Sequence, residues 1–432
     1  MIWLTVLIVF QQHNWHWVQE RMRDLPQLRQ QQAHVAIAES IANQAAKAWS
    51  PQVSAEVNAT STNDPTAVFS GKLANGTFEL RDFAIVSPTG FDTYPVNNPD
   101  AFSDLLLHIH ANQKLYDGGS SHNLRQQAHW QYQSQQWMFR DHEQQAWLQL
   151  VRGLLEIDML TNQLVAAKEL LEHTELSLRR VEALAAEGQV PTVRVAQSQA
   201  SQASMAARVI AIEALLTART QALANWLDVS PSDIEHFPEL PKVPDIQTTD
   251  IRYSEHVAQS ILHASESGQK SILPKWKPKV NLNAVFTNHQ GDQTHWWAGI
   301  SASWHLMDRG ASQARKGQAS ANVMLAQAHL ETQQRSSKQA RDVTQAMYAA
   351  TQAEHRALSQ AEQAASSSLQ AQNAMLEEGQ LDAGSLFEVR QNLLNLQQDR
   401  IATQARMDQL GWQLLDAHGI DIQSVLMKGN QP

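Results

Sequence analysis

The amino-acid sequence predicts a mainly α-helical fold with four β-strands per chain, arranged as two copies of a plan in which strands precede a long helical hairpin. An internal repeat is the first observation behind this prediction. The stretch 114–128 returns as 305–319, with six identical residues at a constant offset of 191 positions. A second stretch, 186–200, resembles 377–392, and its Gly188 lies 191 positions before Gly379. Two equally spaced pairs indicate duplication of a segment whose length matters.

The distribution of proline is the other observation. Of the 14 prolines, none lies between Pro99 and Pro191, and none lies between Pro278 and Pro432. Proline breaks a helix because it lacks the backbone N–H and its ring clashes with the preceding turn. Long proline-free runs rich in Ala, Gln, Glu and Leu therefore predict extended helices in both copies.

The first repeat is expected over 13–227. Its elements are, in order, a helix over 13–48, strands at about 51–60 and 104–116 with an inserted loop at 62–103 between them, and a helical hairpin over 118–227. The helix ends before Pro51, because the residue before a proline disfavours helical backbone. Apolar residues alternate with polar ones in both strands, as at Leu107 and His108. Within the loop, Asn75-Gly76 is typical of a hairpin turn.

The second repeat, 250–418, is expected to contain the same elements without the inserted loop. These are a helix over 250–273, strands at about 277–287 and 296–307, and a helical hairpin over 309–418. A linker over 228–249, which contains four prolines, separates the repeats, and a tail over 419–432 follows the second one.

The helical hairpins are expected to be long and thin. Each outgoing helix spans 71 positions, from Asp117 to Gly188 and from Asp308 to Gly379. At ~1.5 Å per residue this gives a rod on the order of 100 Å. Its apolar residues follow narrow heptad seams, which predict coiled-coil packing against neighbouring helices and not a thick core.

The range 1–12 begins with a short apolar run that has no basic residue before it and no small-residue cleavage site after it. Two interpretations stay open: a truncated remnant of a secretory signal, and a buried or mistakenly included segment. If the first is correct, we expect a start codon further upstream.

Composition and motifs exclude several classes of protein. The net charge is −10 and Lys and Arg do not cluster, so no nucleic-acid partner is expected. The sequence has no cysteine, zinc-protease helix, phosphate loop, dinucleotide fingerprint or nucleophile elbow. We therefore expect no enzyme and no cofactor. His108 and His110, which share a strand face, could bind a metal with a third group, but polar residues facing water are the commoner explanation, so no metal site is expected.

Four short strands cannot close a β-barrel, because small barrels need about eight. An open sheet would also leave unpaired strand edges, which are a hazard for aggregation. Three copies would supply twelve strands to one ring, with the helical hairpins below it as a second, helical tube. The pattern therefore predicts a homotrimer.

These features resemble the TolC-like outer-membrane efflux protein family of Gram-negative bacteria. The resemblance runs from Leu25-Pro26-Gln27-Leu28 to Ile420 and is carried by both strand-to-helix junctions, both glycine reversals and the doubled order of elements. It implies a homotrimeric channel with a 12-stranded β-barrel in the lipid of the outer membrane and an α-helical barrel in the periplasm. It also implies a periplasmic adaptor and an inner-membrane pump of RND or ABC type. The implied function is a passive exit duct for small molecules, either drugs or metal ions.

The resemblance assigns roles to the two glycine reversals. The periplasmic tip that docks to the adaptor is implied at Gly188, Val190 and Pro191, and at Gly379, Leu381 and Asp382. Candidates for a channel constriction are Glu388, Ser385 and Arg194. The family often has acidic residues at the positions of Ser385 and Glu388. Glu388 fits that pattern, and Ser385 departs from it. Three Glu388 carboxylates near a threefold axis would attract cations, whereas a solvated helix end is the alternative.

The strand-to-helix junctions are expected at Asp117, Gly119, Asp308 and Gly310. Tryptophans at the strand ends would suit either an aromatic girdle at a membrane surface or packing at the helix–strand joint; they are Trp49, Trp276, Trp296 and Trp297. Two other functions stay open, a channel for type I protein secretion and a soluble coiled-coil scaffold without true strands.

Overall fold

The computed structural model describes most of the chain: residues 14–83, 85–88, 90–92, 94–246, 250–272, 277–289, 293–304, 307, 309–377 and 383–428. These residues divide into two compact units. The helical unit comprises Met1–Ala36, Gln133–Gln259 and Ala328–Pro432, and the sheet unit comprises Ile37–Tyr132 and Ser260–Gln327. No helix within the described residues combines the length and hydropathy that a transmembrane helix requires.

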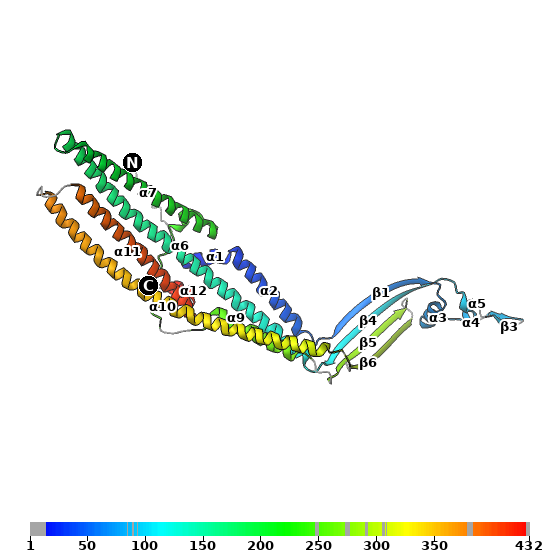
Figure 1. Ribbon diagram of the computed structural model, residues 1–432. Coiled ribbons are helices and arrows are strands. Elements are labelled where there is room, and N and C mark those ends of the chain that lie inside the picture. The colour runs from blue at the N-terminus through cyan, green and yellow to red at the C-terminus, as the bar shows by residue number, and fades with distance from the viewer. Residues whose placement is uncertain are drawn as a thin grey trace, which may run out of the picture. The chain divides into compact units, whose positions relative to one another are not determined.

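The sheet unit contains a four-stranded antiparallel sheet (Figure 1). Its strands are β1 (Gln52–Thr62), β4 (Phe102–Tyr116), β5 (Lys279–His289) and β6 (Gln293–Ser303), in the spatial order β1-β4-β5-β6. The last strand was expected at 296–307. It begins and ends earlier because its ladder with β5 runs from His289 opposite Gln293 to Lys279 opposite Ser303.

An insert over 63–101 connects β1 to β4 and has a fold of its own. It consists of α3 (Pro65–Ala74), α4 (Leu80–Phe83), β2 (Ile85–Ser87), β3 (Gly90–Asp92) and α5 (Tyr94–Asn97). The hairpin expected at Asn75-Gly76 is wrong, because α3 ends there. Gly76 has a φ of 74°, and the Thr77 N–H donates to the Lys72 carbonyl, which is the bond pattern of a helix C-terminus.

Two helical hairpins account for nearly half of the chain. The first pairs α6 (Ser120–Ala186) with α7 (Thr192–Leu227), and the second pairs α10 (Ala311–Glu377) with α11 (Ala383–Ala417). Both outgoing helices have 67 residues. The internal repeat therefore preserves the length of the rod as well as the sequence at its ends.

The ends of the two repeats differ from expectation in two places. A single helix over 13–48 is wrong: α1 (Trp15–Arg23) and α2 (Pro26–Ala46) are separate, because Pro26 has no N–H to continue α1 and instead opens α2. The tail contains α12 (Ile422–Lys428), whose Ile422 and Leu426 are fully buried. Two further helices, α8 (Pro231–Ile234) and α9 (Tyr253–Lys270), lie in and after the proline-rich linker.

The helical unit has a hydrophobic core that the narrow heptad pattern of apolar residues in the hairpin helices did not predict. Trp15, Trp147 and Trp412 are each at most 2% exposed, and α12 packs into the same cluster. The rings of Trp15 and Trp147 meet edge to face with centroids 6.4 Å apart. Side chains from α1, α6, α7, α11, α12 and the linker contribute to this cluster, so it joins the start of the first repeat to the ends of both repeats.

Candidate functional site

The sheet has one polar and one apolar face. Directly paired residues of an antiparallel sheet share a face, so the register assigns each side chain. One face carries mostly polar side chains: Gln52, Ser54, Glu56, Asn58, Thr60, Asp104, His108, His110, Asn112, Asn283, Thr287, His289, Gln293, His295, Gly299 and Ser301. Four large apolar side chains share this face: Phe102, Leu106, Val285 and Trp297. The opposite face carries mostly apolar ones: Val53, Ala55, Val57, Leu105, Leu107, Ile109, Leu282, Ala284, Phe286, Trp296, Ala298, Ile300 and Ala302.

The apolar face is exposed to solvent in the single chain. Val53, Ile300 and Trp296 are 66%, 69% and 78% exposed. Burying apolar surface is worth roughly 25 cal/mol per Å². A continuous face of this kind indicates that another apolar phase or another chain covers it.

The two edges of the sheet are formed by β1 and β6, and neither pairs with a further strand among the described residues. Both edge strands are almost wholly exposed, whereas β4 and β5 are mostly half-buried. Because the four strands alternate in direction, β6 of one copy and β1 of another would run antiparallel. The edges therefore suit extension of the sheet by a second copy.

Hydrogen bonds between side chains connect neighbouring strands on the polar face. His108 Nδ1 lies 3.0 Å from Thr287 Oγ1. Asn112 donates to Asn283, which donates in turn to Ser301 Oγ at 3.1 Å. The rings of His108 and His110 lie 5.8 Å apart, but within the described part of the chain no set of three His, Cys, Asp or Glu residues is placed to hold a metal ion.

The strand-end tryptophans divide between the two faces. Trp296 belongs to the apolar face, whereas Trp297 belongs to the polar face and lies next to Gly299. Trp49 is 37% exposed just before β1, and Trp276 lies outside the described residues. Trp296 thus has the position that a membrane-surface girdle requires.

The first strand-to-helix junction is held by Asp117, which is 3% exposed. Its Oδ2 accepts from the Ser121 N–H at 2.9 Å and lies 3.6 Å from Lys114 Nζ, and its Oδ1 accepts from the Gly119 N–H at 3.2 Å. Burial raises the pKa of the Asp117 carboxyl, but the hydrogen bonds from Ser121, the Lys114 charge and the Gly119 N–H together hold that pKa below its usual range. The carboxylate thus caps the start of α6.

The second junction repeats the backbone of the first. Gly118 and Gly119 have φ angles of 65° and 91°, and Arg309 and Gly310, 191 positions later, have 50° and 84°. Left-handed backbone at both places turns the chain from strand to helix. Asp308, the counterpart of Asp117, lies outside the described residues.

The first helix reversal is described in full. Gly188 has a φ of 70°, and the Gln189 N–H donates to the Leu184 carbonyl at 2.9 Å, which ends α6. Pro191 precedes α7, and the Arg194 N–H donates to the Pro191 carbonyl in the first turn. Val190 is half-buried between the two helices.

The second reversal lies mostly outside the described residues, including Gly379, Leu381 and Asp382. Ser385 belongs to the first turn of α11, but its side chain is outside the described part. Glu388 is exposed in the second turn of α11. The structure therefore does not bring the three constriction candidates together within one chain's described residues.

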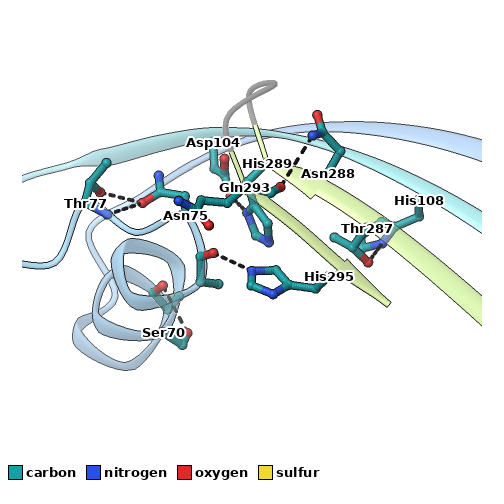
Figure 2. Close-up of polar contacts among 12 residues, drawn as sticks. Ser70, Asn75, Thr77, Asp104, His108, Thr287, Asn288, His289, Gln293 and His295 are labelled. Carbon is teal, nitrogen blue, oxygen red and sulfur yellow. Dashed lines mark hydrogen bonds and ion pairs between the residues drawn. The ribbon is translucent and has the colours of Figure 1, made fainter. Parts of the chain in front are cut away.

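A cluster at the end of the sheet had no signal in the sequence (Figure 2). His289 Nδ1 lies 2.8 Å from Asp104 Oδ2, and both residues are less than 10% exposed. His295 Nε2 donates to the Ala74 carbonyl at 2.7 Å, and its ring meets His289 edge to face. These residues lie far apart along the chain, so only the sheet register brings them together.

Comparison with known proteins shows what the chain is similar to. Residues 17–227 match the family described as Outer membrane efflux protein. This segment is just under half of the chain, and through it the chain resembles the outer membrane efflux protein family. Its location is the outer membrane, with a large periplasmic portion. The family consists of channel proteins, so the prediction that the chain is not an enzyme is confirmed.

Solved structures share the fold over nearly the whole chain. VceC from Vibrio cholerae matches with 17% identity and a TM-score of 0.75 over 94% of this chain and 95% of that one. CmeC from Campylobacter jejuni matches with 13% identity and a TM-score of 0.75 over 93% of this chain and 84% of that one. MtrE from Neisseria gonorrhoeae matches with 13% identity and a TM-score of 0.70 over 94% of this chain and 89% of that one. VceC is described as an outer membrane protein, and CmeC and MtrE as outer membrane channels. No curated protein matches the sequence.

The predicted fold class, mainly helical with a four-stranded antiparallel sheet, is confirmed. Members of this fold combine a strand barrel with a helical barrel. The TolC-like resemblance is confirmed by the same matches.

Proposed function

We propose that three copies of this efflux protein join edge to edge into a closed ring of twelve strands. The observation that carries the proposal is the sheet itself, with one polar face, one exposed apolar face and two open antiparallel edges. Closure pairs β6 of each copy with β1 of the next and removes every open edge. The apolar face then meets lipid, and the polar face lines a water-filled interior.

The ring acts as a passive exit duct for small molecules, drugs or metal ions. An inner-membrane pump of RND or ABC type supplies the energy through a periplasmic adaptor. Support comes from the family match and from solved relatives that are described as outer membrane channels. A pump partner also agrees with the absence of any nucleotide-binding motif in the sequence.

The helix reversals are proposed as the periplasmic tip that meets the adaptor. Gly188, Val190 and Pro191 supply the tip of the first hairpin, and Gly379, Leu381 and Asp382 supply that of the second. Arg194 and Ser385 lie within a turn or two of these reversals and Glu388 slightly further along, where a ring of three chains narrows. The exposure of Glu388 in the single chain supports a role toward the interior of the assembly.

Reconstitution into planar lipid bilayers tests the proposal. The purified full chain, produced with a functional secretory signal, should give discrete single-channel currents. A preparation that inserts into lipid but never conducts would contradict the channel. Deleting the gene should raise the sensitivity of the host to drugs or metal ions; loss of one secreted protein with unchanged sensitivity would favour type I secretion instead.

A further inference from the structure

Helix α3 of the insert over 63–101 packs on the polar face of the sheet at the end where β1 passes into β4, and α4, α5 and β3 lie beyond the strand ends (Figure 1). Three of its contacts establish this position. The Ala74 carbonyl at the end of α3 accepts from His295, Gly76 lies against the Gln293 side chain, and Gly71 lies against the ring of Phe102. His295 and Gln293 share the face of His289, and Phe102 shares the face of Asp104 two residues along β4.

The insert is a packed structure and not a loose loop. Val68 of α3 is 3% exposed, and Asn75 is 8% exposed. Lys72 and Asp82 form an ion pair at 2.7 Å that joins α3 to α4. The hydrogen bond from Lys72 is the main reason that the Asp82 pKa lies below its usual range. The rings of Phe69 and Phe78 meet edge to face at 4.9 Å.

The sheet below the insert is fixed by buried polar contacts. Asp104 and His289 join β4 to β5, and the ring of His289 contacts His295 on β6 (Figure 2). The insert thus starts at one edge strand, β1, and reaches the opposite edge strand, β6. It crosses the full width of the polar face at this end.

We propose that the insert is a constriction at the exit mouth of the channel. This inference rests on the proposed function, because it requires that the polar face line the interior of the ring. A body attached to that face at the strand ends lies inside the mouth, and three copies bring three such bodies toward the axis. The insert also exposes large apolar side chains, Phe69, Leu73, Leu80 and Phe83. An apolar constriction resists the passage of water and ions.

The second repeat supplies a natural replacement for the insert. Thr62 pairs with Phe102 at the last rung of the β1–β4 ladder, and His289 pairs with Gln293 at the last rung of the β5–β6 ladder. Only 290–292, Gln-Gly-Asp, connects the latter pair. Grafting this tripeptide between Thr62 and Phe102 removes the insert and keeps the strand register. In planar bilayers, the graft should raise the single-channel conductance about twofold, because one of two constrictions in series, the mouth and the helix tips, is gone.

A single cysteine tests the same claim without a deletion, since the natural chain has none. Leu73→Cys places a thiol on the 59%-exposed side chain of α3. A bulky charged methanethiosulfonate, added on the side of the strand ends, should reduce the conductance of this variant. Ala59→Cys, which lies on the apolar face of β1, is the matched control and should keep its conductance.

The outcomes separate the two proposals. If the natural chain does not conduct, the proposed channel itself fails. If it conducts, but the graft leaves conductance unchanged and Leu73→Cys responds like Ala59→Cys, the channel stands and the constriction is wrong. If the graft does not fold, the thiol experiment alone decides, because Leu73→Cys alters only one exposed side chain.

Discussion

Gly118 and Arg309 occupy the same position in the two repeats, and both have left-handed backbone, with φ angles of 65° and 50°. Glycine adopts this conformation without cost, whereas a residue with a Cβ loses roughly 1–2 kcal/mol there. The turn from strand to helix therefore keeps its geometry in the second repeat at the expense of local strain.

The first prediction concerns this strain. Arg309→Gly should raise the free energy of unfolding by up to about 1 kcal/mol, and Gly118→Ala should lower it by about 1–2 kcal/mol. Gly317→Ala is the control: Gly317 lies inside α10 with open space around it, so the substitution should stabilise by about 0.5–1 kcal/mol. Chemical unfolding in detergent measures all three. A stabilising Gly118→Ala would contradict the shared turn.

The second prediction concerns pH and Asp117. Because the folded-state pKa of Asp117 is lowered, its contribution to stability is present above the unfolded value of about 4 and is lost as the pH falls through the folded-state pKa. Asp117→Asn should cost about 1–3 kcal/mol at pH 7, since charged hydrogen bonds at the start of α6 are lost. Unfolding at pH 7 and pH 3 should show a smaller difference between variant and parent at pH 3. An equal difference at both would show that the charge has no role.

The third prediction separates the two faces of β6. Ile300 lies on the apolar face and Ser301, its neighbour, on the polar face. Ile300→Lys should reduce the stability of the protein folded in lipid by up to about 2–4 kcal/mol, because it places a charge against the bilayer. Ser301→Lys should have a much smaller effect. Urea titration in lipid vesicles measures both, and equal effects would contradict the assignment of the faces.

The fourth prediction concerns α12, at the end of the chain. Leu426 is fully buried in the core of the helical unit, so Leu426→Ala should cost about 2–5 kcal/mol. Lys428→Ala, on the exposed end of the same helix, should change stability by less than about 0.5 kcal/mol. Thermal unfolding compares the two variants. Similar small effects would show that α12 is not part of the core.

The fifth prediction addresses the proposed constriction at the helix tips. Glu388→Gln should shift the reversal potential in a salt gradient toward zero, because three carboxylates would no longer favour cations. Glu354→Gln, an exposed position on α10, is the control and should leave the reversal potential unchanged. An unaltered selectivity in Glu388→Gln would assign this residue to a solvated helix end.

Regular features of the fold were predictable from the sequence because they leave local or periodic signals. The offset of 191 between Gly119 and Gly310 marked both junctions, and alternation along β4 marked the two faces of the sheet. Gly188 marked the first reversal, because left-handed backbone at a helix end favours glycine.

Other features were missed for physical reasons. Asn75-Gly76 suits a hairpin turn and a helix C-terminus equally well, and only the hydrogen bonds of α3 distinguish the two. Pro26 can start a helix as well as stop one, so the division between α1 and α2 was read as continuous helix. The core around Trp15, Trp147 and Trp412 joins residues that are more than a hundred positions apart, and no local pattern reveals such contacts.

The polar contacts of the sheet below the insert were missed for the same reason. Asp104, His289 and His295 lie on three different strands, and their proximity depends on the register of two ladders. A composition or spacing argument cannot supply that register. The proposed role of the insert therefore depends on contacts that only the structure shows.

The mass of the protein extracted from the outer membrane in mild detergent tests the central claim most directly. Light scattering that separates protein from detergent mass should give three chains per particle, as closure of a twelve-stranded ring requires. A particle of one or two chains, or recovery of the protein only from the soluble fraction, would contradict the ring and favour a coiled-coil scaffold.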